Sequence, residues 1–361
     1  MKMLFISSRD VNKKLHGGFQ CTNRNYLSFC EIIGPENVEV LDLKSGQNKS
    51  FFKRIIKWIN YLYGFNDGLS HRIIKDIIAQ SKDKEKIFID TSQFGILAYY
   101  LKKAKFKGDI ICFFHNVEIK IQMEAVRRNI FKLWRLILTY FNEKNAAKYA
   151  DRIVALNRRD RAELQKRYGI KNIHIIPISL SDTFKVAQIE FTSVHPTLLF
   201  IGNNWYANIH GLNWFVKNVL DHVDIKLQVV GTGMDVLREK YIHPKIEFLG
   251  YVPSLSLVLG KADYVIYPIF LGSGMKVKTC EALMYGKNII GSEEAFEGYE
   301  INYHEVGAVC NTKEEFIHTI KHYCSIERTK FNDYSRKCFL EKYSFQATLT
   351  KFDDLLLNNK N

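Results

Sequence analysis

The chain reads Gly272-Ser273-Gly274-Met275-Lys276-Val277-Lys278-Thr279-Cys280-Glu281-Ala282-Leu283 shortly after an apolar run, residues 262–269. That run is typical of a buried strand, so the glycines follow the carboxyl end of a strand. Glycine adopts backbone conformations closed to other residues and lets a ligand approach the chain closely. The pattern predicts a helix from about Met275, whose first N–H groups favour a phosphate.

Gly274, Lys278 and Glu281 fall on one stripe of that predicted helix, at spacings of four and three residues. An ammonium neutralises phosphate, and an ionised carboxylate accepts hydrogen bonds from both hydroxyls of a ribose. The segment therefore suits a nucleotide diphosphate. A surface helix with an ordinary Lys–Glu pair explains the same pattern equally well.

The length and composition limit the class of protein and the number of domains. At 361 residues, with 47% hydrophobic and 25% charged residues, the chain is globular and long enough for about two domains. Seven cysteines without a Cys-x-x-Cys pair or a close Cys/His cluster suggest reduced core residues in a cytoplasm and argue against a structural metal. No run approaches the roughly 20 apolar residues of a membrane span. We expect a soluble or peripheral protein.

Strand-length apolar runs alternate with amphipathic stretches, which predicts an α/β fold of two doubly wound, Rossmann-like domains facing a cleft. We expect domains over residues 1–183 and 184–340, and a C-terminal helix over 341–361 that packs back on the first domain. The predicted strands are 2–7, 38–43, 86–90, 109–114, 152–156, 173–178, 197–201, 226–230, 245–248, 264–268 and 288–291.

Charge is concentrated in the first half. Residues 1–185 hold 34 Lys and Arg against 18 Asp and Glu, whereas the remainder holds 18 against 20. Such polarity suggests an anionic partner for the first domain, although a basic domain is often merely soluble. Residues 51–62 add apolar positions at helical spacing with a basic edge, which suits either an anionic membrane surface or a core-facing helix.

Polar residues follow several predicted strands of the first half. Since ligands bind outside the carboxyl ends of parallel strands, these residues are candidate ligand contacts. A histidine there donates to substrate oxygens or takes a proton near neutral pH, although a lone histidine is more often structural. The glycines lack the G-x-G-x-x-G spacing of a dinucleotide site. The residues are Arg9, His16, Gly17, Gly18, Gln93, His115 and Asn116.

The order of motifs in the second half resembles the donor domain of retaining glycosyltransferases of group 1, which have the GT-B fold and build bacterial cell-surface polysaccharides. The likeness is strong from 196 to 300 and loose elsewhere. The motifs are Phe200-Ile201-Gly202-Asn203, Val230-Gly231-Thr232-Gly233, Phe248-Leu249-Gly250-Tyr251-Val252 and the opening segment through Gly286.

The resemblance implies a hexosyltransferase that retains the anomeric configuration and needs neither a metal nor a bound cofactor, the nucleotide sugar being its co-substrate. It implies His115, Lys278 and Glu281 as catalytic residues, with Glu281 holding the ribose. It implies Arg9, His16, Gly17, Gln93 and Asn116 as acceptor contacts. The donor contacts that it implies are Gly18, Gly202, Asn203, Gly231, Gly250, Tyr251, Val252, Ser273, Gly274, Met275, Lys276 and Val277.

Two departures from the family pattern stand out. The family often has a glutamate at the position of Ser273, where it contacts the donor sugar. It also often has Arg and Lys in the segment that is 203–208 here, so the phosphate charge falls to Lys276 and Lys278.

The resemblance predicts transfer of a sugar, from a UDP-sugar rather than a GDP-sugar, to a glycan or polyprenyl-diphosphate-linked acceptor. The pathway would be capsule, lipopolysaccharide or exopolysaccharide synthesis, in the cytoplasm or at the inner membrane face, with no nucleic-acid partner. A nucleotide-sugar epimerase and a non-catalytic binding protein of the same fold are the alternatives.

Overall fold

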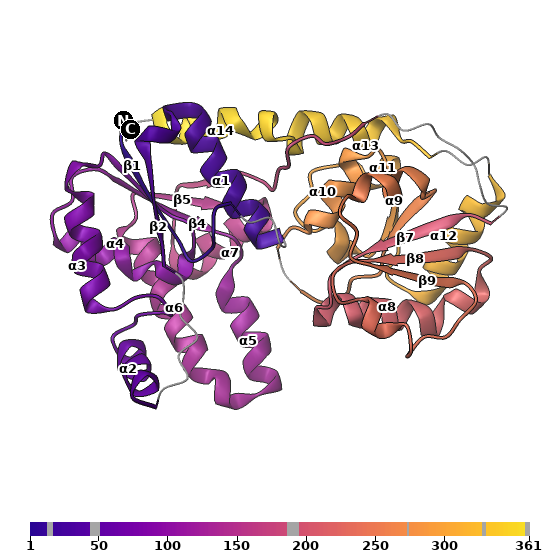
Figure 1. Cartoon of the computed structure of the whole chain (residues 1–361), viewed down its shortest axis with the longest axis horizontal. Helices are drawn as coiled ribbons and strands as arrows, with labels where there is room; N and C mark the ends of the chain where they lie inside the picture. Colours follow the sequence, from indigo (N-terminus) through magenta and orange to yellow (C-terminus); the bar gives the residue numbers. More distant parts are fainter. Residues whose placement is uncertain (13–16, 44–50, 186–194, 273, 327–329, 358–361) are drawn as a thin grey trace. The chain divides into compact units, whose positions relative to one another are not determined.

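The computed structural model describes residues 1–12, 17–43, 51–185, 195–272, 274–326 and 330–357. The chain divides into two compact units. Unit 1 comprises Met1–Pro177 and Thr348–Asn361, and unit 2 comprises Ile178–Ala347. Figure 1 shows that each unit is a parallel sheet covered by helices.

Unit 1 contains a six-stranded parallel sheet in the order β2-β1-β3-β4-β5-β6. Its strands are β1 (Met3–Ser7), β2 (Val38–Asp42), β3 (Lys86–Ile89), β4 (Asp109–Phe114), β5 (Arg152–Ala155) and β6 (Ile173–Ile175). Its helices are α1 (Gly17–Ile33), α2 (Phe51–Leu62), α3 (His71–Gln80), α4 (Ile96–Lys103), α5 (Glu118–Arg128), α6 (Leu133–Tyr149) and α7 (Arg158–Tyr168).

Unit 2 repeats this architecture with the order β12-β11-β10-β7-β8-β9. Its strands are β7 (Thr197–Ile201), β8 (Lys226–Val230), β9 (Ile246–Gly250), β10 (Tyr264–Tyr267), β11 (Asn288–Gly291) and β12 (Gly307–Val309). Its helices are α8 (Tyr206–Asn218), α9 (Leu255–Lys261), α10 (Val277–Met284), α11 (Tyr303–Val306), α12 (Lys313–Ser325) and α13 (Asp333–Cys338), and α14 (Phe345–Leu357) ends the described chain.

All eleven predicted strands are present, within a few residues at each end. Most of their residues are hydrophobic because parallel strands are covered on both faces, and every residue of β1 and β10 is buried. The prediction missed β12, whose three residues, Gly307–Val309, form no marked apolar run.

The second half of α14 packs on unit 1. Phe352 contacts Phe29 of α1 edge to face, with ring centroids 5.3 Å apart, and the guanidinium of Arg24 lies over the same ring. The Arg152 guanidinium donates to the carbonyl oxygen of Leu355. Two buried cations and an aromatic contact thus fix this end of the chain to the sheet of unit 1.

Each sheet has one point where the strand order reverses. In unit 1 it lies between β1 and β3, and in unit 2 between β7 and β10. The chain leaves these neighbouring strands in opposite directions, so the loops at their carboxyl ends separate and leave room for a ligand. The candidate residues of both halves lie on the loops around these two points.

Candidate functional site

The loop after β10 is held in shape by Lys276. Its ammonium donates to the carbonyl oxygen of Gly274 at 2.8 Å and to Oε1 of Glu294 at 2.5 Å. Gly272 and Gly274 have φ of 123° and 70°, which favour glycine. Lys276 therefore fixes the loop internally, and its charge is already compensated by a carboxylate.

The helix begins two residues later than predicted. Lys276 has the extended values φ −89° and ψ 113°, so α10 starts at Val277 and not at Met275. Gly274 lies before the helix, and the predicted stripe of three residues is wrong for that position. Lys278 and Glu281 do share a face of α10, one turn apart.

The ammonium of Lys278 lies in an apolar and weakly polar setting. It sits over the rings of Phe200 and Tyr267, at 5.2 and 5.5 Å from their centroids. Burial and the charge of Lys276 lower the pKa of Lys278 to about 7, and the carboxylate of Glu281 opposes that fall. An anion beside Lys278 would restore its charge, so this lysine is suited to a phosphate.

Asn208, which the sequence analysis did not single out, connects two loops. Its Oδ1 accepts from the Lys278 ammonium at 2.6 Å, and its Nδ2 donates to the backbone carbonyl oxygen and Oδ1 of Asn203, both at 2.9 Å. The side chain thus joins the loop after β7 to the first turn of α10. The signal in the sequence was the position of this amide, in the first turn of the helix that follows the Gly202 loop.

The glycines of three neighbouring loops allow close backbone packing. Gly231 has φ 145°, and a Cβ there would lie 1.9 Å from the carbonyl oxygen of Gly202. The Gly231 N–H donates to the carbonyl oxygen of Gly250 at 2.8 Å. Beyond Gly250, the side chain of Tyr251 is 69% exposed and Val252 is half-buried. The loops after β7, β8 and β9 therefore form one edge, with an aromatic ring at its end.

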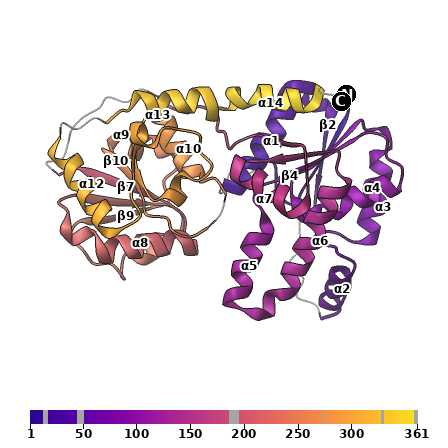
Figure 2. The same cartoon turned by 180° about the vertical axis from the view of Figure 1, so that it is seen from behind.

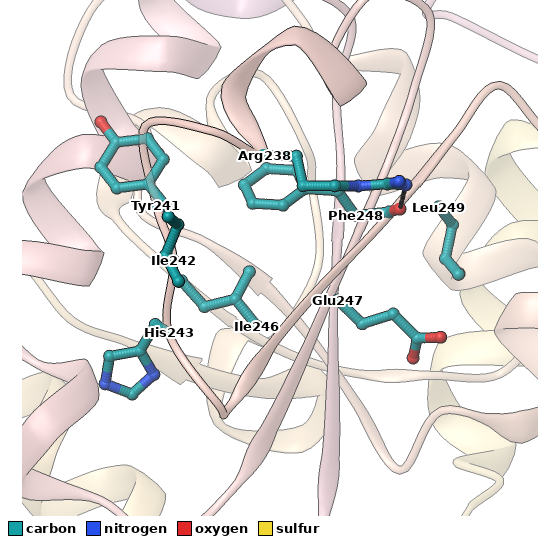
Figure 3. A pocket seen from close by; sticks show the side chains of 8 residues that line it. All are labelled: Arg238, Tyr241, Ile242, His243, Ile246, Glu247, Phe248 and Leu249. Atoms are coloured by element: carbon teal, nitrogen blue, oxygen red, sulfur yellow. Dashed lines mark hydrogen bonds between the residues drawn. The ribbon is translucent and has the colours of Figure 1, made fainter.

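A separate hollow of about 560 Å³ lies along β9 (Figure 3). Its polar groups are engaged with the protein: the Arg238 guanidinium donates to the carbonyl oxygen of Phe248, and Glu247 is paired with Lys226. It contains none of the predicted donor residues, and we assign it no ligand.

In unit 1, a buried carboxylate faces His115. Asp90, directly after β3, accepts hydrogen bonds from Ser7, Thr22 and Asn25 at 3.2, 2.5 and 2.8 Å. His115 Nε2 lies 3.4 Å from its Oδ2. The sequence analysis missed Asp90, although a carboxylate at the end of an apolar strand marks such a position.

Asp90 keeps His115 charged. Burial and Arg9 alone would lower the pKa of His115, but Asp90 and Cys21 raise it to about 9. At neutral pH the imidazolium is therefore a hydrogen-bond donor and not a base.

Arg9 and the two glycines lie at the start of α1. The helix begins at Gly17, and a Cβ on Gly18 would lie 3.2–3.3 Å from the guanidinium of Arg9. The guanidinium thus packs against the first turn. His16 and Ser273 lie outside the described residues.

Gln93 and Asn116 meet at one carboxylate. Both side-chain amides donate to Glu118, each at 3.3 Å. Glu118 is the first residue of α5, and its N–H donates to the buried Glu143 at 2.8 Å. Burial raises the pKa of Glu143 to about 7.

Gln93 also lines a pocket of about 350 Å³ within unit 1. The pocket combines amides, a carboxylate and three aromatic residues, of which Tyr61 and Trp134 are stacked with their ring centroids 4.7 Å apart. Its other polar side chains include Asn66, Asp67, Gln122, Arg135 and Thr139. In the described part of the chain, no three His, Cys, Asp or Glu residues are grouped so as to hold a metal.

Residues 195–325 match the family model for glycosyl transferases group 1. The match covers the three glycine loops, Asn208, Lys278 and Glu281. The chain is a glycosyltransferase whose residues 195–325 belong to group 1. A search of curated proteins finds no match to the sequence.

Solved structures show that this glycosyltransferase has the GT-B fold. It is similar to the lipopolysaccharide outer core galactosyltransferase WaaB (TM-score 0.68, 12% identity, 98% of each chain). It is similar to a sucrose-phosphate synthase from Thermosynechococcus elongatus (TM-score 0.75, 14% identity, 98% of each chain). HepE from Anabaena in complex with UDP and glucose is a third (TM-score 0.68, 9% identity, 99% of this chain and 100% of that one).

Two groups of predicted residues emerge from the geometry. In unit 2, Lys278, Asn203 and the loops of Gly202, Gly231 and Gly250 lie together, and Glu281 is one turn from Lys278. In unit 1, Arg9 and Gly18 lie by the Asp90–His115 pair, whereas Gln93 and Asn116 meet at Glu118. The structure adds Asn208, Asp90 and Glu118 to the sequence-based set.

Proposed function

We propose that this glycosyltransferase transfers a sugar from a UDP-sugar to a hydroxyl of a glycan or lipid-diphosphate-linked acceptor, with retention of configuration. The donor assignment rests on Lys278, which lies in the first turn of α10 beside the switch point. Burial lowers the pKa of its ammonium to about 7. The similarity to HepE, solved with UDP and with UDP-glucose, supports UDP over GDP.

The proposed donor contacts follow from this position. Lys278 neutralises the diphosphate together with the N–H groups at the start of α10, and Glu281 accepts hydrogen bonds from the hydroxyls of the ribose. The exposed ring of Tyr251 is the proposed stacking surface for the base. We assign Lys276 a loop-fixing role and not a phosphate contact, because Glu294 already compensates its charge.

The proposed chemistry is a substitution at the anomeric carbon. The acceptor oxygen forms a bond to that carbon, the bond to the diphosphate oxygen breaks, and the departing phosphate takes the acceptor proton. Lys278 and the helix N-terminus stabilise the charge that develops on the leaving group. His115, held as a cation by Asp90, is proposed to donate to a hydroxyl of the transferred sugar.

We place the acceptor site in the pocket of unit 1 that Gln93 lines. Amides and a carboxylate bind hydroxyls, and the Tyr61–Trp134 pair offers a flat apolar wall, as a sugar ring requires. The similarity to WaaB supports synthesis of a bacterial cell-surface polysaccharide. We propose that the enzyme works in the cytoplasm at the inner membrane face, and no described helix is long and apolar enough to cross a membrane.

A thermal shift with UDP, GDP, dTDP and CMP tests the donor assignment. A ligand at 100 times its Kd stabilises the folded state by about 2.7 kcal/mol. We expect UDP to raise the Tm of the wild type, and the Lys278→Met and Glu281→Ala variants to lose most of that rise.

Lys287→Met is the matched control for Lys278→Met. Lys287 is also buried with a lowered pKa, but its ammonium donates to the backbone carbonyls of Ala262 and Lys330. Its loss should lower the Tm and leave the UDP shift intact. A wild type that responds to none of the four nucleotides would refute the proposal.

A further inference from the structure

Exposed apolar side chains are concentrated at one end of unit 1. Of the 24 large hydrophobic residues exposed in the described chain, 13 belong to α2 with the following Tyr63 or to the α5–α6 hairpin. They are Ile55, Ile56, Trp58, Ile59, Leu62, Tyr63, Met123, Ile130, Phe131, Leu133, Ile137, Tyr140 and Phe141. Figures 1 and 2 show α2 and the ends of α5 and α6 projecting away from the sheet of unit 1.

The hairpin tip is the most exposed part of this surface. Helix α5 ends at Arg128, and a 3-10 turn, Ile130–Lys132, separates it from α6. Asn129 takes an extended conformation there, and its side chain accepts from the Phe131 N–H. Phe131 is consequently 86% exposed, and Ile130 is 64% exposed.

The helix α2 and the hairpin form one continuous surface. Trp134, at the start of α6, contacts Trp58 and Tyr61 of α2, with ring centroids 5.0 and 4.7 Å apart. On α2, Ile56 is 57% exposed and Leu62 is 86% exposed. The core-facing interpretation of this helix is therefore wrong for the described positions 55–62. We call the exposed apolar residues of α2 and of 130–137 the apolar wedge.

The hairpin that carries part of the wedge is basic. Between residues 124 and 138 the hairpin carries Arg127, Arg128, Lys132 and Arg135 against one carboxylate, Glu124. On α2, Lys57 is paired with Asp67 at 2.8 Å. Apolar side chains with a basic margin complement the acyl chains and the anionic headgroups of a bilayer. In a symmetric contact between two copies, the same basic margins would face and repel each other.

We propose that the apolar wedge inserts into the surface of an anionic lipid bilayer, with Ile130 and Phe131 at its leading edge. This inference rests on the membrane location proposed above and identifies the surface responsible for it. The occupant is the lipid bilayer and not a protein partner, because exposed isoleucines and a phenylalanine in a basic hairpin complement both the acyl chains and the anionic headgroups.

The test is flotation of the full chain with vesicles of phosphatidylcholine alone or with phosphatidylglycerol added. We expect binding to the anionic vesicles only. The double variant Ile130→Ser, Phe131→Ser should bind these vesicles at least about ten-fold more weakly. Arg127→Gln with Lys132→Gln should weaken binding by roughly five-fold per charge removed.

The matched control is Ile242→Ser with Leu257→Ser, two comparably exposed apolar residues of unit 2, at 92% and 71%. It should bind vesicles like the wild type. Unchanged melting curves and UDP shifts establish that each variant is folded, and they separate failure of this inference from failure of the donor assignment.

Equal binding to neutral and anionic vesicles, or full binding by the Ile130→Ser, Phe131→Ser variant, would overturn the proposal. Light scattering adds a third test. A wild-type dimer that this variant dissociates would assign the wedge to a second copy of the chain instead.

Discussion

The titration of Lys278 predicts how donor binding depends on pH. Because the pKa of this lysine in the folded protein is about 7, half of the molecules carry the ammonium at pH 7. The charged form binds a diphosphate, so the apparent Kd equals the intrinsic Kd divided by the charged fraction. The charged fraction is about nine tenths at pH 6 and about one eleventh at pH 8.

UDP-glucose should therefore bind about two-fold more tightly at pH 6 than at pH 7, and about five-fold more weakly at pH 8. Its diphosphate is a diester that does not titrate near neutral pH. His115, with a pKa of about 9, remains largely charged over this range. The dependence thus reports on Lys278.

Isothermal titration calorimetry in two buffers of different ionisation enthalpy measures both the affinity and the protons taken up. At pH 7 we expect an uptake of about half a proton per UDP-glucose bound. The Lys278→Met variant should bind weakly and without proton uptake. An affinity that stays constant from pH 6 to 8, or the same slope in the variant, would refute the reasoning.

Three further outcomes follow from the same geometry. Lys278→Met should raise the free energy of unfolding of the free protein by roughly 1–2 kcal/mol at pH 6, measured by urea unfolding, because it removes a buried charge; this value is reduced for partial solvent access. The gain should fade as the pH rises from about 7 towards 10.5, since the folded protein then carries the lysine uncharged. Gly231→Ala should lower the free energy of unfolding by about 3 kcal/mol or more, because its Cβ would lie 1.9 Å from a carbonyl oxygen. The control Gly169→Ala, whose Cβ would have no atom within 4 Å, should lower it by about 1 kcal/mol, and equal losses would contradict the packing argument. Asp90→Asn should lower the pKa of His115 from about 9 towards 6.5, as followed by NMR, and should remove stability that the wild type has in full below pH 6.5 and loses as pH rises through about 9. An unchanged His115 titration in that variant would separate the two residues.

The fold was predictable because parallel strands covered on both faces leave mainly apolar runs, and eleven of the twelve described strands carry that signal. The three-residue β12 does not. The start of α10 was predicted two residues early, since the extended backbone of Lys276 is fixed by contacts with Gly274 and with the distant Glu294. Propensity near a helix end contains no information about such partners.

The residues of the candidate site divide in the same way. The types and order of Gly202, Gly231, Gly250, Lys278 and Glu281 indicated a phosphate-binding loop system, because backbone freedom and charge are properties of the residues themselves. Asn208 and Asp90 were missed. Each acts through hydrogen bonds to residues 65 or more positions away, such as Lys278 and Asn25.

The sequence by itself therefore determined the parallel sheets, the glycine loops and the family of this glycosyltransferase. Only the tertiary structure decided how the charges are used. It pairs Lys276 with Glu294 and leaves Lys278 over two aromatic rings, and it holds His115 as a cation beside Asp90. It also turns the apolar face of α2 outwards, since periodicity shows that a helix has an apolar face but not what covers it. A pKa and an exposed surface depend on neighbours brought together by folding, and no local pattern encodes them.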